Sequence, residues 1–145
     1  MSNFWFMNKK LFIVINVDWF FLSHRKEMAI AALKEGYDVT IIASNTGRAD
    51  EIIALGLKWV DLPIKRSSVN VFRELKTILF LVRLYKKNKP DIVHHVTLKV
   101  SLYGTIAAYF SKINAVVNAI SGLGFAISSG DKGAFAGNLS KIDKL

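Results

Sequence analysis

The sequence contains no cysteine and only two prolines among its 145 residues. Without cysteine the chain can form neither a disulfide framework nor a thiolate metal site, and this composition fits a reducing cytoplasm. No uninterrupted apolar run approaches the ~18 residues that a membrane span needs, so we expect none. Hydrophobic residues nevertheless make up 52% of the chain, which is enough for one folded domain with an ordinary core.

Acidic residues are also scarce. Eleven Asp and Glu residues stand against 20 Lys and Arg residues, giving a formal net charge of +9. This balance indicates an anionic partner, which could be nucleic acid, phospholipid or a phosphorylated small molecule. Nucleic-acid modules usually interleave basic residues with exposed aromatics or carry a known reading motif. The sequence has neither, so we expect no nucleic-acid partner.

Motifs for several common cofactors and reactions are missing. No glycine lies between Asn16 and Gly36, where a dinucleotide-binding fold carries G-x-G-x-x-G so that the backbone can approach a pyrophosphate. The chain has no G-x-x-x-x-G-K-[ST] loop and no G-x-S-x-G elbow. Its histidines and carboxylates show no metal-ligand spacing, so we expect no metal site.

Five apolar, β-branched runs alternate with helical segments, as expected for strands buried on both faces of a sheet. The alternation predicts right-handed crossovers and an α/β fold, a Rossmann-like doubly wound parallel sheet of about five strands in the order 3-2-1-4-5. The expected strands are 11–17, 38–43, 57–62, 92–96 and 115–119, and the expected helices are 23–35, 48–55, 71–88 and 101–111.

A few residues set the limits and the buried face of these helices. Gly36 and Gly56 should end the first two helices in a left-handed conformation. Asn70 is a candidate N-cap for the long helix, which Pro90 prevents from continuing. Met28 and its apolar neighbours should face inward from the first helix.

Polar or glycine-rich segments follow three of the expected strands, at 18–25, 97–99 and 121–124. Loops at the carboxyl ends of parallel strands face one edge of the sheet, where ligands bind. The basic residues near this edge are each compatible with a solvated loop charge, but together they suggest recognition of a phosphate or diphosphate. They are Arg25, Arg48, Lys65, Arg66 and Lys99.

All three histidines fall at or near the same edge. Adjacent strand residues point to opposite faces, so His94 and His95 cannot both enter one crevice, and one of them should be a packed, hydrogen-bonded histidine. His24 is expected to open the first helix, where free N–H groups favour anions. Ser23 beside it could be only an N-cap.

The helix expected at 71–88 combines basic and apolar residues. Its apolar set is Phe72, Leu75, Ile78, Leu79 and Val82, and its basic set is Arg73, Lys76, Arg83, Lys86 and Lys87. A basic amphipathic helix can lie on an anionic membrane surface. The alternative is a core helix with a solvated basic face, and on the sequence alone we favour this alternative.

Five blocks, at 18–25, 36–39, 90–93, 97–104 and 118–124, resemble in order and spacing the amino-terminal domain of family 4 glycosyltransferases. The subgroup that they resemble most assembles capsule, lipopolysaccharide and protein-linked glycans on lipid carriers. The resemblance implies half of a metal-independent, retaining GT-B enzyme, whose second domain holds the nucleotide-sugar. It assigns residues 9–127 to this domain and leaves 1–8 as an unassigned extension. Residues 128–145 are expected to be an irregular tail that stops short of the donor-binding domain.

The resemblance also implies roles for residues at the edge, although it identifies no catalytic residue. His24, Arg25, Thr97 and Lys99 would contact the acceptor or its phosphate, and Ser121, Gly122 and Gly124 would line the cleft near the donor diphosphate. The expected partners are a lipid-linked or glycan acceptor, an anionic membrane surface at the cytoplasmic face, and a donor-binding domain or chain. No cofactor is expected beyond the nucleotide-sugar co-substrate. A non-catalytic membrane-associated subunit and an inactive truncated remnant remain as alternatives.

Overall fold

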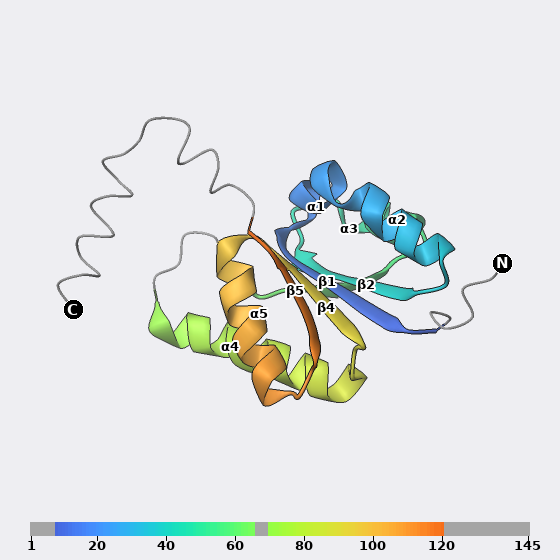
Figure 1. The fold of residues 1–145 in the computed structure, drawn as a ribbon. Helices are drawn as coiled ribbons and strands as arrows, with labels where there is room; N and C mark the ends of the chain where they lie inside the picture. The colour runs from blue at the N-terminus through green and yellow to red at the C-terminus, as the bar shows by residue number, and fades with distance from the viewer. Residues whose placement is uncertain (1–7, 66–69, 121–145) are drawn as a thin grey trace, which may run out of the picture.

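Five parallel strands form one sheet in the part of the chain that the computed structural model describes, residues 8–65 and 70–120 (Figure 1). The order along the sheet is β3-β2-β1-β4-β5, as the alternation of strands and helices predicts. The strands are β1 (Lys10–Val17), β2 (Asp38–Ser44), β3 (Lys58–Asp61), β4 (Ile92–Val96) and β5 (Ala115–Ala119).

Helices cover both faces of the sheet and give the domain three layers (Figure 1). One face carries α1 (Asp18–His24), α2 (Lys26–Lys34) and α3 (Ala49–Ala54), and the other carries α4 (Val71–Asn88) and α5 (Leu98–Phe110). The central strand β1 contributes to both interfaces, because Ile13 belongs to the core cluster beneath α2 and Val14 to the cluster beneath α4 and α5. Both side chains are fully buried, as the continuous apolar run predicts.

The expected first helix, 23–35, is confirmed as α2 over Lys26–Lys34, but its expected start is wrong. The chain enters α1 directly at Asp18, leaves helical geometry at Arg25, where φ is −127°, and starts α2 at Lys26. The early start buries Phe21 completely in the sheet-facing core. Ala29 is fully buried and Ala32 and Leu33 pack against the core, as expected, but Met28 is 40% exposed instead of facing inward. Helix α5 also begins three residues earlier than expected, at Leu98.

The expected helix ends are confirmed. Gly36 and Gly56 have φ of 96° and 88°, in the left-handed region that favours glycine. The Asn70 side chain accepts a hydrogen bond of 3.0 Å from the N–H of Phe72, as an N-cap does. Helix α4 ends at Asn88, just before Pro90.

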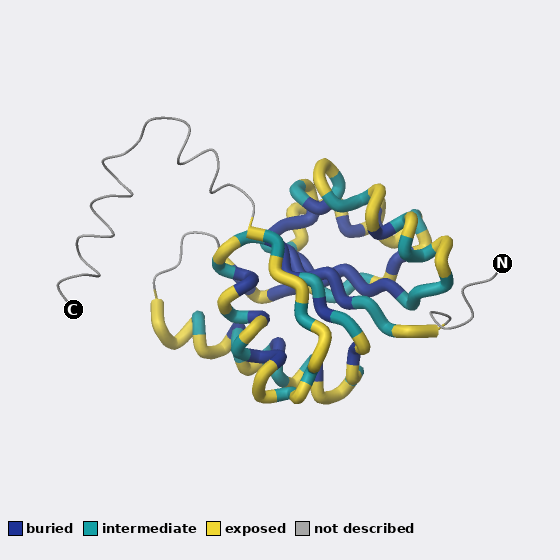
Figure 2. The backbone as a smooth tube through the Cα atoms, viewed as in Figure 1, coloured by how far each residue is buried: buried dark blue, intermediate teal, exposed yellow. Residues whose placement is uncertain are grey.

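Helix α4 has a narrow buried face and a wide exposed one. Thr77, Leu81 and Tyr85 are buried, at the four-residue spacing of a helix face packed on a core. Phe72 and Leu79, which belong to the expected apolar set, are 77% and 52% exposed. Figure 2 shows the first turns of α4 largely exposed. No helix within residues 8–65 and 70–120 is both long and apolar enough to cross a membrane.

Candidate functional site

A cavity of about 740 Å³, here called the edge cavity, lies at the carboxyl edge of the sheet. The ends of β1 and β2, one side of α1 and the start of α5 form its walls, as expected for a ligand site in an open parallel sheet. The residues that line it are Asn16, Val17, Trp19, Phe20, His24, Ser44, Thr46, Ile64, Thr97 and Lys99. Three of the four expected acceptor-contact residues, His24, Thr97 and Lys99, therefore lie together.

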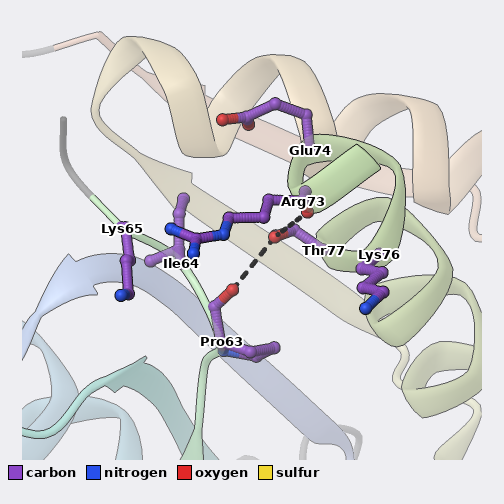
Figure 3. A pocket seen from close by; sticks show the side chains of 7 residues that line it. All are labelled: Pro63, Ile64, Lys65, Arg73, Glu74, Lys76 and Thr77. Carbon is purple, nitrogen blue, oxygen red and sulfur yellow. Dashed lines mark hydrogen bonds between the residues drawn. The ribbon is translucent and has the colours of Figure 1, made fainter. Parts of the chain in front are cut away.

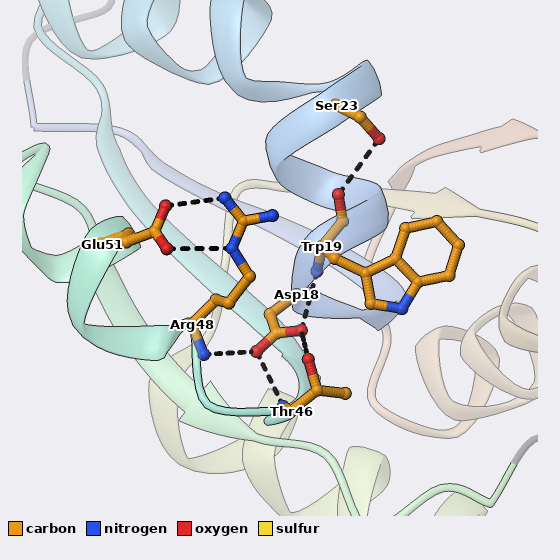
Figure 4. A network of polar contacts seen from close by, with 6 residues as sticks. All are labelled: Asp18, Trp19, Ser23, Thr46, Arg48 and Glu51. Atoms are coloured by element: carbon orange, nitrogen blue, oxygen red, sulfur yellow. Dashed lines mark hydrogen bonds and ion pairs between the residues drawn. The ribbon is translucent and has the colours of Figure 1, made fainter.

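A buried carboxylate holds two walls of the edge cavity together (Figure 4). Asp18 is fully buried at the end of β1. One of its oxygens accepts hydrogen bonds from the Thr46 hydroxyl and the Trp19 N–H, and the other accepts bonds of 2.7 and 3.0 Å from the N–H groups of Thr46 and Arg48. Burial acts to raise the pKa of Asp18, but these hydrogen bonds outweigh it and lower the pKa overall. The ionised carboxylate thus fixes the β2–α3 loop against the start of α1.

The Arg48 side chain does not offer a free charge to a phosphate. Its Nε and Nη2 donate bonds of 2.9 and 2.8 Å to the two carboxylate oxygens of Glu51, and Figure 4 shows this pair on the side of Asp18 away from Trp19. Arg48 and Glu51 are three residues apart, a spacing that the expected helix 48–55 already brings together.

Helix α1 presents an aromatic wall to the edge cavity, made by Trp19, Phe20 and His24. Phe20 and His24 stack with centroids 4.2 Å apart, and Trp19 meets Phe20 edge to face at 5.8 Å. Trp19 is 40% exposed. Trp19 and Phe20 were not singled out from the sequence, although two aromatics directly after a strand-ending acid were the available signal.

The prediction that His24 opens a helix is wrong, because it ends α1. Ser23 is accordingly not an N-cap, and its hydroxyl bonds back to the Trp19 carbonyl at 3.0 Å. The Ser23 oxygen also lies 2.7 Å from Nδ1 of His24. Which of these two atoms donates depends on the imidazole tautomer.

Two oxygens at the edge cavity are buried without a hydrogen-bond partner among the described residues, Oδ1 of Asn16 and Oγ1 of Thr97. Leaving such groups unpaired costs free energy, about 1–3 kcal/mol each. Thr97 also has φ of 78°, in the region that favours glycine, where a β-branched residue is strained. Its N–H bonds to the carbonyl of Ala119 at 3.0 Å, which ties this conformation to the end of β5.

Lys99 lies in the first turn of α5 and is held by residues of other segments. Its Nζ lies 2.9 Å from a carboxylate oxygen of Glu74, donates to the Lys65 carbonyl at 3.0 Å, and sits 5.8 Å from the centre of the Tyr103 ring. Burial acts to raise the pKa of Glu74, but hydrogen bonds from Tyr103 and Lys99 lower it overall. Burial and the bond to Glu74 raise the pKa of Tyr103 to about 12. The Lys99 charge is therefore neutralised within the domain.

A smaller cavity of about 400 Å³ is lined in part by Glu74 of this ion pair (Figure 3). It is bounded by the segment after β3, including Lys65, and by the first turns of α4, where Arg73 extends over it. The Thr77 hydroxyl closes its floor by bonding to the Pro63 carbonyl at 3.1 Å. Of the basic residues expected at the edge, Arg48 and Lys99 are thus held in ion pairs and Lys65 lines the smaller cavity, so these three do not form one open phosphate site.

Arg25 does not line the edge cavity, contrary to its expected contact with the acceptor. Its Nη1 donates to the His24 carbonyl at 3.2 Å. Burial, followed by the Arg25 charge, lowers the pKa of His94 in β4. The break between the two helices directs Arg25 away from the cavity.

His95 is the packed histidine that strand alternation predicts. Its Nδ1 lies 2.8 Å from Oδ1 of Asn118, which can only accept, so Nε2 accepts from the Tyr85 hydroxyl at 2.8 Å. Burial lowers the pKa of His95 to about 4. A Cβ at Gly104 would lie 2.2 Å from Nε2 of this ring, so only glycine fits there. This chain of hydrogen bonds joins α4, β4 and β5.

The remaining site predictions lie outside the described residues: Arg66, Ser121, Gly122 and Gly124. Within residues 8–65 and 70–120, no group of three or more His, Asp or Glu residues could hold a metal ion.

Comparison with known proteins identifies relatives for most of the chain. The model of the family described as glycosyl transferase 4-like matches residues 10–145. An Escherichia coli protein, UDP-Gal:alpha-D-GlcNAc-diphosphoundecaprenol alpha-1,3-galactosyltransferase, is 26% identical over 63% of this chain and 24% of its own length. N,N'-diacetylbacillosaminyl-diphospho-undecaprenol alpha-1,3-N-acetylgalactosaminyltransferase of Campylobacter jejuni is 31% identical over 75% of this chain and 30% of its own length. The match thus spans less than a third of either relative.

Solved structures share the fold. The chain aligns with MurG of Acinetobacter baumannii at a TM-score of 0.55 and 21% identity, over 76% of this chain and 34% of that one. UDP-GlcNAc 2-epimerase of Neisseria meningitidis aligns at a TM-score of 0.56 and 18% identity, over 75% and 31% of the two chains. These likenesses support the Rossmann-like α/β architecture.

Proposed function

Because the chain belongs to the glycosyl transferase 4-like family, we propose that it supplies the acceptor-binding half of a nucleotide-sugar-dependent glycosyltransferase. The acceptor is a sugar linked through diphosphate to a polyprenol, and the process is cell-surface or lipid-linked glycan synthesis. The observation that carries the proposal is the edge cavity, where a strand-end site with unpartnered oxygens adjoins an aromatic wall.

The relatives support the choice of acceptor. The E. coli and C. jejuni relatives carry names that specify sugars on diphosphoundecaprenol. Such a molecule has a polar sugar, an anionic diphosphate and an apolar chain, and it stays in the membrane. A protein that binds it needs a sugar site close to a surface that tolerates lipid.

In this proposal the described residues bind and orient the acceptor. The His24 ring forms a hydrogen bond with an acceptor hydroxyl, and the hydrogen bonds of the Asp18 carboxylate keep the α1 and β2–α3 walls at a fixed separation. Transfer also needs the donor in the same closed, water-poor cleft. A donor-binding domain or chain supplies that half, and transfer proceeds with retention at the donor sugar.

The exposed face of α4 supports peripheral attachment at the cytoplasmic face of the membrane. Phe72, Leu75 and Leu79 are exposed there. Helical spacing puts Arg83 and Lys86 on the same outward face. Exposed apolar residues followed by cations are suited to the interface of an anionic bilayer.

Flotation with lipid vesicles tests the proposal. Vesicles that contain N-acetylglucosaminyl-diphosphoundecaprenol should retain more of the chain than vesicles of equal charge that contain undecaprenyl phosphate instead. Equal retention by both would contradict an acceptor-binding role. A non-catalytic subunit would also pass this test, but it would give no transfer when a donor-binding partner and nucleotide-sugar are added.

A further inference from the structure

The two walls of the edge cavity differ in chemistry. The α1 side offers aromatic surface, with Trp19 partly exposed beside the stacked pair Phe20 and His24. The strand-end side offers the buried, unpartnered oxygens of Asn16 and Thr97. A ligand that packs on the aromatic wall and donates hydrogen bonds to the oxygens of the other wall needs an apolar C–H face on one side and hydroxyl groups on the other. A pyranose ring has both.

The charges at the edge cavity are already paired. The Asp18 carboxylate accepts its hydrogen bonds from Thr46, Arg48 and Trp19. Among the lining residues the only Lys or Arg is Lys99, and its ammonium contacts Glu74 and the Lys65 carbonyl. An anion entering the cavity would have to break that ion pair, whereas a neutral ligand would not.

We propose that the edge cavity binds the neutral sugar ring of the acceptor, with Trp19 as its stacking platform, and that the acceptor diphosphate lies outside the cavity. Asn16 Oδ1 and Thr97 Oγ1 accept hydrogen bonds from sugar hydroxyls. This assignment rests on the proposed function, and it narrows the expected contact of Thr97 with the acceptor or its phosphate to a contact with the sugar.

The conformation of Thr97 makes the assignment testable. With φ of 78°, the position favours glycine. Thr97→Gly removes the hydroxyl and relieves backbone strain, so this variant should keep its fold while it loses the proposed contact. Thr97→Ser keeps the hydroxyl and should keep the binding.

Nuclear magnetic resonance of the full 145-residue chain tests the site with two soluble probes, methyl N-acetyl-α-glucosaminide and inorganic pyrophosphate. The glycoside should shift the Trp19 indole N–H and the Thr46 amide in a saturable way, and pyrophosphate should shift neither. Trp19→Ala and Thr97→Gly should each weaken glycoside binding by roughly fivefold to tenfold. Phe72→Ala, an exposed aromatic on α4, is the matched control and should change nothing. Pyrophosphate shifts at Trp19, or glycoside binding unchanged by both variants, would overturn the inference.

A lipid-like probe separates this inference from the proposed function. N-acetylglucosaminyl-diphosphofarnesol should bind more tightly than the glycoside and shift the same signals. If it binds but leaves Trp19 and Thr46 unshifted, acceptor binding stands and the sugar site is overturned. If it binds no better than the glycoside while both shift Trp19, the sugar site stands and the lipid-linked acceptor is contradicted. If neither compound shifts Trp19, the sugar site is overturned.

Discussion

The carboxylate of Asp18 accepts hydrogen bonds from both the backbone N–H and the side-chain hydroxyl of Thr46, 28 positions further along the chain. Asp18 directly follows the central strand and begins α1, while Thr46 lies in the loop after the neighbouring strand. The contact therefore connects the aromatic wall of the edge cavity to its opposite rim. Since the carboxylate is fully buried, its hydrogen bonds are not exchanged with water.

Asp18→Asn should destabilise the domain. The amide can accept with only one of its two polar atoms, so either the Trp19 N–H or both the Thr46 and Arg48 N–H groups lose their acceptor and face another donor. We expect the free energy of unfolding to fall by about 2–4 kcal/mol, measured by urea denaturation. Glu27→Gln removes a carboxylate from a well-exposed side chain and should change stability by less than about 0.5 kcal/mol. Equal stability of the Asp18 variant and the native protein would contradict the structural role of this buried carboxylate.

Acid should destabilise the fold through His95. Burial lowers the pKa of His95 to about 4 in the folded state, against 6.5 for an ordinary histidine. The unfolded chain therefore binds a proton between these values while the folded chain does not, so stability falls as the pH drops from about 6.5 to 4. The loss from this group is on the order of 3 kcal/mol. The lowered pKa of Asp18 acts in the same direction at more acid pH.

The measurement is the pH dependence of unfolding, combined with NMR titration of the imidazole signals. The His95 ring should remain neutral at pH 5, with its proton on Nδ1. A His95 ring that titrates near 6.5 in the folded protein would contradict both the burial and the hydrogen-bond assignment.

Membrane attachment through α4 should depend on charge. Reversing Arg83, Lys86 and Lys87 to glutamate should release the chain from anionic vesicles without unfolding it, and added salt should have the same effect because it screens exposed charges. Co-sedimentation with vesicles, together with circular dichroism, measures both outcomes. A control variant with the same change of net charge reverses Lys9, Lys34 and Lys112, which are exposed on other segments. Vesicle binding that changes neither with added salt nor with the α4 substitutions would contradict attachment by this helix. So would a control variant that loses binding as fully as the α4 variant does.

The sheet could be predicted from the sequence because its determinants are local. Continuous β-branched runs such as the one in β1, and the left-handed stop at Gly36, need no knowledge of distant residues. The sequence does not indicate helix α1, because an Asp directly after a strand, followed by aromatics, looks like the start of a loop. Only the burial of Phe21 in the sheet-facing core reveals the helix.

The sequence predicts that three candidate residues meet at one edge of the sheet, but it does not predict whether their charges are already paired. His24, Thr97 and Lys99 do meet at one edge, as strand topology requires. Whether a cation there is free depends on partners far along the chain, however. Lys99 meets Glu74 across the interface of α4 and α5, and no local pattern indicates that pairing. The Asp18–Thr46 contact is non-local in the same way.

A direct comparison of donor and acceptor binding by the purified chain tests the central claim most sharply. Isothermal titration with N-acetylglucosaminyl-diphosphofarnesol and, separately, with UDP-N-acetylglucosamine gives the two affinities under one condition. The account predicts saturable binding of the acceptor analogue, little or no binding of the nucleotide-sugar, and no sugar transfer when both are present. Binding of the nucleotide-sugar without binding of the acceptor analogue, or measurable transfer by the chain alone, would contradict it.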